Sequence, residues 1–330
     1  MSTRSPLRRR RQLRLAARLA RAGSPLAAVK WLSASLRGSM EPMDLSLGGK
    51  QVQIRPATAD LDEALRGSQV SRRKFKYSFE KGRADKVRSE DGALAAWRYL
   101  WAGFTGQEMV QVTIRGVQVH IRPLTTDIDV VLDSLGGEFD ELIDKVPAAR
   151  HGLIVDAGGY IGTAAIVFAR AFPDATVVTL EPSAENFALL QKNVAPYANI
   201  KPLNAALSSE SGTMQFFDRG TGHWGLTLVG DAQDNATRAV GETEVVTVTD
   251  ILQRFGKDGI DIIKIDIEGG EHALFSANIE WVEKTEAICI ELHDRIVPGC
   301  TEAYERVAAG RQNSKLEGEK FFSIREQVGK

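Results

Sequence analysis

The sequence predicts an α/β fold built on a doubly wound, mostly parallel sheet. Two observations lead to this prediction. From Leu153 onward, short apolar runs of strand length alternate with longer segments that carry apolar residues at helical spacing. Four of the apolar runs also end in a carboxylate, at the position where open α/β sheets bind their ligands. Alternation of this kind is typical of successive βαβ units in one sheet.

The elements of this region follow in order. Apolar runs predict buried strands at 153–157, 175–182, 199–207, 260–267 and 286–292. Segments of helical period predict helices at 161–172, 183–194 and 270–279. Pro173 ends the first helix, and Ser183 with Asn186 three residues later marks the start of the second. Further runs predict an antiparallel insertion at 213–218, 226–230 and 243–250, and a terminal hairpin at 314–327.

Length and composition restrict the class of protein. A chain of 330 residues with 43% hydrophobic and 26% charged residues is typical of a globular protein of about two domains. Its 42 basic residues nearly balance its 43 acidic ones, so the whole molecule has no general polyanion-binding character. The two cysteines, Cys289 and Cys300, argue against a disulfide framework and a cysteine-based zinc site. Since no apolar run reaches about 18 residues, we expect a soluble, cytoplasmic protein.

Basic residues are concentrated at the N-terminus, where no acidic residue precedes Glu41. We expect residues 1–44 to form a basic tail that is partly disordered or helical. A basic amphipathic helix in this tail would make a peripheral membrane contact, and a nucleic-acid arm is the other alternative. Residues 45–145 are expected to form an N-terminal α+β subdomain, and 146–330 a second, larger domain.

The subdomain contains an internal repeat, because 45–65 and 112–132 share residues at matching positions. Each copy predicts two short strands joined at a glycine, a turn limited by proline and a helix that starts at an aspartate. For the matching residues Arg55 and Arg122, a structural role at the turn is favoured over binding of an acidic ligand.

Between the two copies, the segment 71–90 is basic with interleaved aromatic residues. Such a composition can bind single-stranded nucleic acid, but its acidic residues favour a solvated connector. We expect a helix to follow and to pack through Trp97 and Trp101.

A glycine-rich turn follows the first strand of the larger domain. Asp156 precedes Gly158 and Gly162, and the glycines lack the G-x-G-x-x-G spacing of dinucleotide-binding turns. A carboxylate here would repel a pyrophosphate, and it suits a cationic or hydroxyl-bearing ligand such as an amino-acid moiety. Glu181, at the end of the next strand, is placed to accept hydrogen bonds from a ribose diol; a helix N-terminal charge is the alternative. Together the two carboxylates favour a nucleoside site.

A second group of polar residues follows two later strands. Asp266 and Glu268 occupy alternate positions, and Glu271 lies about one helical turn beyond. Glu291 and His293 alternate in the same way after the neighbouring strand. Carboxylates and an imidazole at one sheet edge can supply the base or the metal ligands that transfer to a hydroxyl requires. The structural alternatives are that Glu268 and Glu271 cap a helix and that His293 is a loop histidine whose hydrogen bonds are made within the protein.

Five segments together match the pattern of one family: 118–132, 154–194, 222–225, 260–275 and 288–300. With these motifs the chain resembles the FkbM-type S-adenosylmethionine-dependent methyltransferases. The resemblance implies a class I methyltransferase fold, which has a Rossmann-like seven-stranded sheet with an antiparallel last strand. It also implies methylation of a hydroxyl, commonly of a sugar or a polyketide-derived natural product.

The resemblance further implies which residues hold S-adenosyl-L-methionine. Asp156, Gly158 and Gly162 are implied to surround its methionine part, and Glu181 to bind its ribose. Asn204 and Ala205 are implied to lie near its adenine, and Asp266 beside its methyl group. Tyr160 belongs to the same expected site, and here the chain has Gly159 and Tyr160 where the family usually has Ala-Asn.

The main hypothesis is therefore an S-adenosylmethionine-dependent O-methyltransferase (EC 2.1.1.-) with a small-molecule acceptor. His293 is the first candidate for the general base, oriented by Glu291 or Asp266, because an imidazole titrates near neutral pH. Alternatively, a divalent cation held by Asp266, Glu268 and Glu291 acidifies the acceptor hydroxyl.

Substrate contacts are expected from His223 and Trp224 in the insertion, as a lid or a sugar-stacking wall, and from Glu268 and Glu271. Two other classes of function stay open at this point. One is a catalytically silent binding protein on the same fold. The other is a nucleic-acid methyltransferase, which the near-zero net charge disfavours.

Overall fold

The structure is a computed structural model that describes residues 43–47, 50–54, 77–146, 150–220, 222–223, 225–233, 237–315 and 319–326. For 43–47, 50–54 and 77–81 the description covers the backbone alone. The expected basic tail and most of the first repeat copy, with Arg55, lie outside the described residues, so these expectations stay predictions.

The chain divides into two compact units. The first comprises Met1–Val117 and Ile121–Ile128, and the second comprises Gln118–His120 and Asp129–Lys330. The boundaries expected at 44/45 and 145/146 stay predictions. In the part of the chain that the structure describes, no helix is long and apolar enough to cross a membrane.

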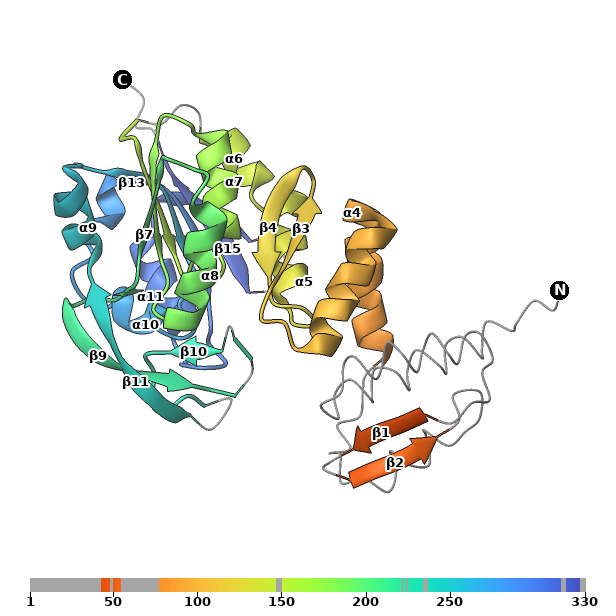
Figure 1. The fold of residues 1–330 in the computed structure, drawn as a ribbon. Helices are drawn as coiled ribbons and strands as arrows, with labels where there is room; N and C mark the ends of the chain where they lie inside the picture. The colour runs from red at the N-terminus through yellow and green to blue at the C-terminus, as the bar shows by residue number, and fades with distance from the viewer. Residues whose placement is uncertain are drawn as a thin grey trace. The chain divides into compact units, whose positions relative to one another are not determined.

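The second unit is built on a seven-stranded sheet with the order β14-β15-β13-β12-β5-β6-β7 (Figure 1). Five neighbouring strands run parallel, whereas β15 runs antiparallel to β13 and to β14. The bounds are β5 (Leu153–Ala157), β6 (Thr176–Leu180), β7 (Ile200–Leu203), β12 (Ile260–Ile265), β13 (Thr285–Glu291), β14 (Arg311–Lys315) and β15 (Lys320–Arg325). The predicted fold class, a class I methyltransferase sheet with an antiparallel last strand, is confirmed.

Helices cover both faces of this sheet (Figure 1), as the continuous apolar strands require. One face carries α9 (Val248–Phe255), α10 (Glu271–Leu274) and α11 (Cys300–Val307), which share a buried core with alternate residues of β5 and β12. The other face carries α7 (Thr163–Ala171) and α8 (Ala184–Val194), with α6 (Asp140–Lys145) and the π-helical η1 (Ser134–Glu138) beside α7. Phe139, between η1 and α6, packs against Phe168 of α7, with ring centroids 4.9 Å apart.

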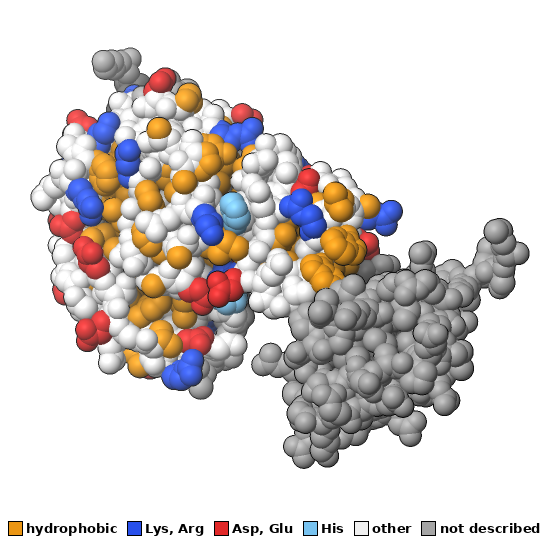
Figure 2. Space-filling model, viewed as in Figure 1, with side chains coloured by type: hydrophobic (Ala, Val, Ile, Leu, Met, Phe, Trp, Pro, Cys, Tyr) orange, Lys and Arg blue, Asp and Glu red, His pale blue; other side chains and the backbone are white. Residues whose placement is uncertain are grey.

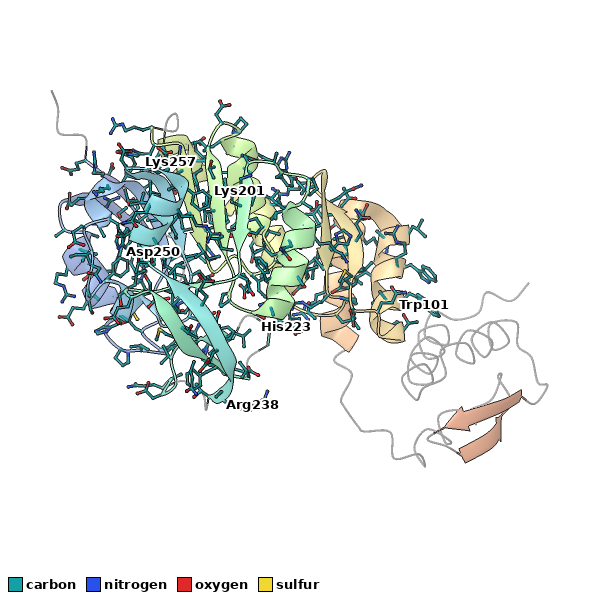
Figure 3. The ribbon with its side chains drawn as sticks, turned by 60° about the vertical axis from the view of Figure 1, so that its left-hand side comes forward. Trp101, Lys201, His223, Arg238, Asp250 and Lys257 are labelled. Atoms are coloured by element: carbon teal, nitrogen blue, oxygen red, sulfur yellow. The ribbon has the colours of Figure 1, made fainter. Side chains whose placement is uncertain are left out.

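An insertion between β7 and β12 forms a four-stranded sheet with the order β10-β9-β11-β8. Its strands are β8 (Ala206–Leu207), β9 (Gly212–Asp218), β10 (Leu226–Thr227) and β11 (Arg238–Val246). The antiparallel pairing of β9 with β10 and β11 agrees with the expected insertion. The expected strand at 243–250, however, ends at Val246. Thr247 and Asp250 form a capping box that starts α9 at this point, with Asp250 on its first turn (Figure 3).

Three further elements differ from the prediction. The expected strand at 199–207 is split between β7 and β8, which belong to different sheets. The expected helix at 270–279 is only the single turn α10, which is followed by a bend and the short 3-10 helix η2 (Val282–Lys284). α11 was not expected. The terminal hairpin is confirmed as β14 and β15.

The first unit contains the long helix α4 (Tyr77–Thr105), and the boundary between the units falls within the second repeat copy. β3 (Val110–Ile114) and β4 (Val117–Ile121) pair with each other, and α5 (Asp127–Asp133) follows the turn. The described part of the first copy is the antiparallel pair β1 (Met43–Leu47) and β2 (Lys50–Ile54). Arg122 has the structural role expected for it, because its side chain and backbone N–H bind the buried carboxylate of Asp127 at 2.9 Å.

The aromatic cluster on α4 does not pack as expected. Trp97 is 57% exposed, and its ring stacks on that of Trp101 with centroids 5.7 Å apart. The buried residues of α4 are instead alanines, Val87 and Tyr99. The hydroxyl of Tyr99 accepts a hydrogen bond from the N–H of Leu124 at 3.0 Å. The prediction that the helix packs through Trp97 was wrong, and hydrophobic side chains are exposed over α4 (Figure 2).

Candidate active site

The carboxyl ends of β5, β6 and β12 bring three polar side chains into register. Asp156 of β5 lies opposite Thr179 of β6 on one side and Lys264 of β12 on the other. Because side chains alternate between the faces of a strand, these three point to the same face of the sheet. The Thr179 hydroxyl donates a hydrogen bond to Asp156 Oδ2 at 2.8 Å, and Lys264 Nζ lies 3.5 Å from Asp156 Oδ1.

Asp156 is completely buried, and its Oδ1 accepts no hydrogen bond from the described residues. Burial raises the pKa of Asp156 above its ordinary value, and Lys264 and Thr179 oppose this only in part. For Lys264, burial acts to lower the pKa, but Asp266 and Asp156 outweigh it and the pKa is raised. The ammonium of Lys264 also donates to the carbonyl of Gly158 at 2.8 Å, so it ties the glycine turn to the edge of the sheet.

The glycine turn after β5 needs glycine for reasons of space and conformation. Gly158 has φ +79°, and a Cβ on it would lie 1.8 Å from the carbonyl oxygen of Asp266. Gly162 precedes α7 with φ +88°, and a Cβ there would lie 2.8 Å from the side chain of Val194. The backbone of the turn therefore packs directly against the end of β12 and against α8. Glycine is the usual residue where a backbone must approach another group this closely.

Glu181 follows β6 and is buried. Its Oε2 accepts a hydrogen bond from the N–H of Tyr160, and its Oε1 accepts one from the N–H of Ser183, both at 2.9 Å. Burial raises the pKa of Glu181 to about 7 in spite of these hydrogen bonds. The carboxylate thus links the glycine turn to the start of α8, where the hydroxyl of Ser183 caps the helix.

Two more of the expected cofactor residues lie near Glu181. The side-chain amide of Asn204 donates to the Glu181 carbonyl at 2.8 Å, and Ala205 beside it is buried. Tyr160 has φ +50°, an uncommon conformation for a residue with a side chain. The structure therefore brings the glycine turn, Glu181 and Asn204 together at one sheet edge.

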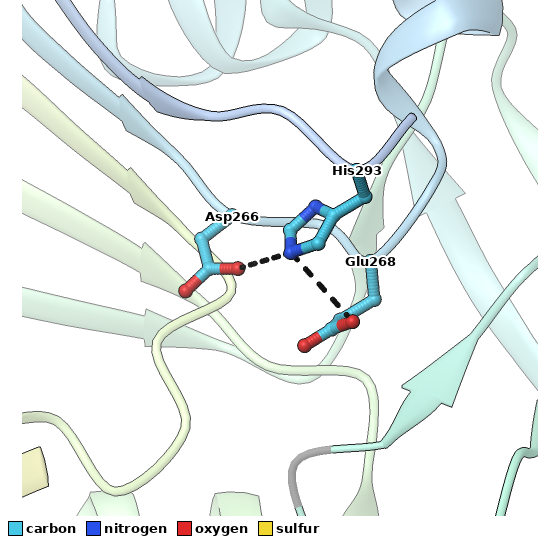
Figure 4. A group of neighbouring side chains, drawn as sticks. All are labelled: Asp266, Glu268 and His293. Carbon is cyan, nitrogen blue, oxygen red and sulfur yellow. Dashed lines mark ion pairs between the residues drawn. The ribbon is translucent and has the colours of Figure 1, made fainter. Parts of the chain in front are cut away.

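His293 lies at the centre of the second group, with Asp266 and Glu268 on either side of its imidazole (Figure 4). Its Nε2 is 3.8 Å from Asp266 Oδ1 and 3.7 Å from Glu268 Oε2. Glu291 Oε1 is a third carboxylate oxygen, 3.9 Å from the same nitrogen. The strand ends of β12 and β13 thus bring together the residues expected to form the catalytic group.

The carboxylate that orients His293 is Glu271, not Glu291 or Asp266 as expected. The distance from His293 Nδ1 to Glu271 Oε1 is 2.8 Å, and neither residue exposes more than 1% of its surface. Glu271 also accepts a hydrogen bond from the N–H of Gly269 at 3.1 Å and is contacted by the thiol of Cys300. Glu271 has no exposed surface and holds the imidazole through Nδ1, and the expected substrate contact stays a prediction.

The charges of the group perturb one another. Burial lowers the pKa of His293, but the hydrogen bond and charge of Glu271 outweigh it and raise the pKa to about 9. Burial and the charge of Asp266 raise the pKa of Glu268 to about 7 and also raise that of Glu291. For Asp266 itself burial acts to raise the pKa, but Lys264 and His293 more than compensate and the pKa is lowered. The pKa of His293 is thus raised mainly by Glu271, the residue that holds its ring through Nδ1.

Cations that surround the group were not singled out by the sequence. Arg219, at the end of β9, donates to Glu268, and Arg295 lies 3.9 Å from the same carboxylate. Lys320 of β15 lies 3.9 Å from Glu291 and also binds Glu138. Arg219 comes from the insertion, Lys320 from the terminal hairpin and Arg295 from the loop between β13 and α11. Of the three, Arg295 lies within a family motif, 288–300, but that motif did not point to its contact with Glu268.

The insertion holds the remaining expected substrate residues. His223 Nδ1 lies 3.2 Å from Glu185 on the first turn of α8, and the His223 carbonyl accepts a hydrogen bond from Asn186 at 2.9 Å (Figure 3). This links His223 to Glu181, because the side-chain amide of Asn186 also donates to Glu181 Oε1 at 3.3 Å. Trp224 lies outside the described residues, so the expected stacking wall stays a prediction.

Comparison with known proteins identifies the domain that carries these residues. Residues 156–309 match the family model of the methyltransferase FkbM domain. The expected resemblance to the FkbM methyltransferases is thus confirmed for this segment. The match begins at Asp156 and contains both polar groups described above.

Two fungal relatives match part of the chain. Methyltransferase sdnD of Sordaria araneosa is 27% identical over 163 residues, which cover 40% of this chain and 62% of that protein. Methyltransferase 1 of Beauveria bassiana is 23% identical over 176 residues, which cover 47% of this chain and 70% of that protein. A solved SAM-dependent methyltransferase from Agrobacterium tumefaciens aligns over 66% of this chain and 70% of its own, with 14% identity and a TM-score of 0.38.

Proposed function

We propose that the protein is an S-adenosylmethionine-dependent methyltransferase that methylates a hydroxyl of a sugar or another small natural product. One observation carries the proposal: successive strand ends of the FkbM domain supply a glycine turn, a buried carboxylate and a group of proton-accepting residues along one sheet edge. These are the parts that a nucleoside-bound methyl donor and a hydroxyl acceptor need side by side.

The residues of the first two strands fit the cofactor. Gly158 and Gly162 leave no room for a side chain in the glycine turn. Because the turn carries no side chain at these positions, a ligand can approach its main chain closely. Glu181 accepts three hydrogen bonds from the protein, and an ionised carboxylate has about four acceptor sites. Its remaining capacity suits a ribose hydroxyl. Buried Asp156 gives the turn a negative charge that suits the cationic amino-acid part of the ligand.

The bound cofactor supplies an electrophilic methyl group on a positively charged sulfur. The protein must then align the acceptor oxygen and receive its proton. Asp266, Glu268 and His293 are the residues that line the neighbouring strand end for this purpose. Glu271 holds the imidazole through Nδ1, so Nε2 is the atom that faces the acceptor side.

Calorimetric titration of the protein with S-adenosylmethionine tests the first half of the proposal. We expect saturable binding, which Asp156→Asn weakens and which Asp174→Asn, an exposed aspartate before β6, leaves unchanged. Absence of binding at millimolar cofactor would contradict the proposal.

Incubation of a cell extract with the protein and isotope-labelled cofactor tests the second half. Mass spectrometry should find the labelled methyl group on a small hydroxyl-bearing molecule. Label in nucleic acid would indicate a different acceptor class, and binding without any transfer would indicate a silent member of the fold.

A further inference from the structure

The side chains of Asp266, Glu268 and His293 offer three possible ligand atoms that lie close together. One atom from each residue lies within 4.8 Å of the other two. The two distances from His293 Nε2, 3.7 and 3.8 Å, are too long for hydrogen bonds. They suit two ligands on one ion, because an ion about 2.1 Å from each ligand can span up to about 4.2 Å between them.

A contact at Nδ1 of His293 orients the imidazole so that its other nitrogen, Nε2, can bind an ion. His293 is 1% exposed, and its Nδ1 pairs with the fully buried Glu271 at 2.8 Å. A neutral imidazole that donates from Nδ1 has its free lone pair on Nε2. Among the described residues, no hydrogen bond reaches Nε2, although it points between two carboxylates (Figure 4). A carboxylate behind a histidine is the usual arrangement around metal-binding histidines.

The charges around Nε2 also favour a cation. Three carboxylates, of Asp266, Glu268 and Glu291, face this one nitrogen within 3.9 Å. Lys264 lies 3.4 Å from Asp266 Oδ2, the oxygen of that carboxylate that does not face His293. Arg219 donates to Glu268 Oε2, the same oxygen that faces His293. These contacts fix the two carboxylates in place, and an ion at Nε2 would share Glu268 Oε2 with Arg219.

We propose that Asp266 Oδ1, Glu268 Oε2 and His293 Nε2 bind one divalent cation of the type that accepts mixed nitrogen and oxygen ligands, such as Mn²⁺ or Zn²⁺. This set replaces the cation site expected from the sequence, in which Glu291 stood in place of the histidine. An all-oxygen ion such as Mg²⁺ is disfavoured because the histidine is the best-prepared ligand.

The role of the ion rests on the proposed function. An acceptor hydroxyl bound to it gives up its proton more readily. The O–H bond then breaks, the proton passes to Glu291 or to water, and the oxygen forms a bond to the methyl carbon. The bond from that carbon to the sulfonium sulfur breaks, and its electron pair stays on sulfur.

Metal binding can be measured without cofactor or acceptor. The full-length protein is stripped of metal with a chelator and titrated with Mn²⁺, while the electron paramagnetic resonance signal of free Mn²⁺ is followed. We expect one ion per chain. Asp266→Asn and His293→Asn should each weaken binding by at least about tenfold, and Glu271→Gln by about 10- to 100-fold because it acts through the imidazole.

Two further variants serve as controls. Asp258→Asn removes an exposed carboxylate whose side chain is 94% accessible and should leave binding unchanged. Glu319→Gln distinguishes the second possible group, Glu291, His293 and Glu319. Loss of binding in Glu319→Gln but not in Asp266→Asn would overturn the ligand assignment.

Wild-type protein provides a second readout that needs no variant. Bound Mn²⁺ should broaden the imidazole resonances of His293 before those of His151, which lies beside Asp258. Absence of stoichiometric binding by either method overturns the proposal. Because S-adenosylmethionine binding is measured separately, failure of the metal site and failure of the proposed function give different results.

Discussion

Replacement of Glu181 by glutamine tests the assignment of this carboxylate to the ribose of the cofactor. Burial raises the pKa of Glu181 from 4.5 to about 7. Each pKa unit corresponds to about 1.4 kcal/mol, so keeping the carboxylate ionised inside the fold costs about 3 kcal/mol. A ribose diol that donates to the ionised form would recover part of this free energy on binding.

The sign of the pH dependence follows from the raised pKa. The folded protein binds the proton of Glu181 more tightly than the unfolded chain does, so its contribution to stability is fully present below pH 4.5. That contribution is lost as the pH rises from 4.5 through about 7. Between these values we expect the wild type to lose about 3 kcal/mol relative to Glu181→Gln. The affinity for S-adenosylmethionine changes in the opposite direction and falls by up to about tenfold per pH unit below pH 7.

Two measurements check this reasoning. Urea unfolding of both proteins at several pH values gives the difference in the free energy of unfolding, in which contributions of other groups cancel. Calorimetry at pH 8 should show cofactor binding weakened in Glu181→Gln by about 1.5–3 kcal/mol, as for a hydrogen bond to a charged group. If the variant keeps the wild-type pH dependence of both quantities, Glu181 is not the titrating group and does not bind the ribose.

Two other substitutions test the turn and the insertion. Gly158→Ala should abolish cofactor binding and lower stability by more than about 2 kcal/mol, because left-handed backbone alone costs a side chain about 1–2 kcal/mol and the new Cβ meets the Asp266 carbonyl. Gly256→Ala, with a similar φ but open space around it, should cost only the conformational part and keep calorimetric binding; equal effects of the two would contradict the steric argument. Thr247→Ala should lower the free energy of unfolding by about 1 kcal/mol through loss of the α9 capping box, and the exposed Thr249→Ala serves as its control in denaturant unfolding.

The sheet could be predicted from the sequence because its central strands are short apolar runs rich in Ile and Val. β5, β6 and β12 lie within the ranges expected for them, and β13 begins one residue before its expected range. The missed helices carried weaker signals. Residues 245–249 have the composition of a strand, and the helix start there is marked only by the Thr247–Asp250 box. α11 has buried residues at 300, 303 and 304, a helical spacing too short to stand out from one sequence.

The candidate site was predictable in its residues but not in their pairing. A polar residue after a buried strand marks the binding edge, and this rule found Asp156, Glu181, Asp266 and His293. It could not show that Glu271 binds His293, because the contact joins residues 22 positions apart through two loops. That pairing moves the pKa of the imidazole to about 9, so the expected general base depended on a partner that the pattern does not encode.

Tyr160 shows how a departure from a family pattern can keep the contact that matters. The family usually has asparagine where this chain has tyrosine, and asparagine tolerates the left-handed backbone that the turn requires. Tyr160 adopts this conformation with φ +50° and still donates its N–H to Glu181 at 2.9 Å. The hydrogen bond that joins the turn to the carboxylate of Glu181 comes from the backbone, which any residue except proline supplies. The substitution therefore costs conformational free energy of about 1–2 kcal/mol but preserves this link, which favours retention of cofactor binding over its loss.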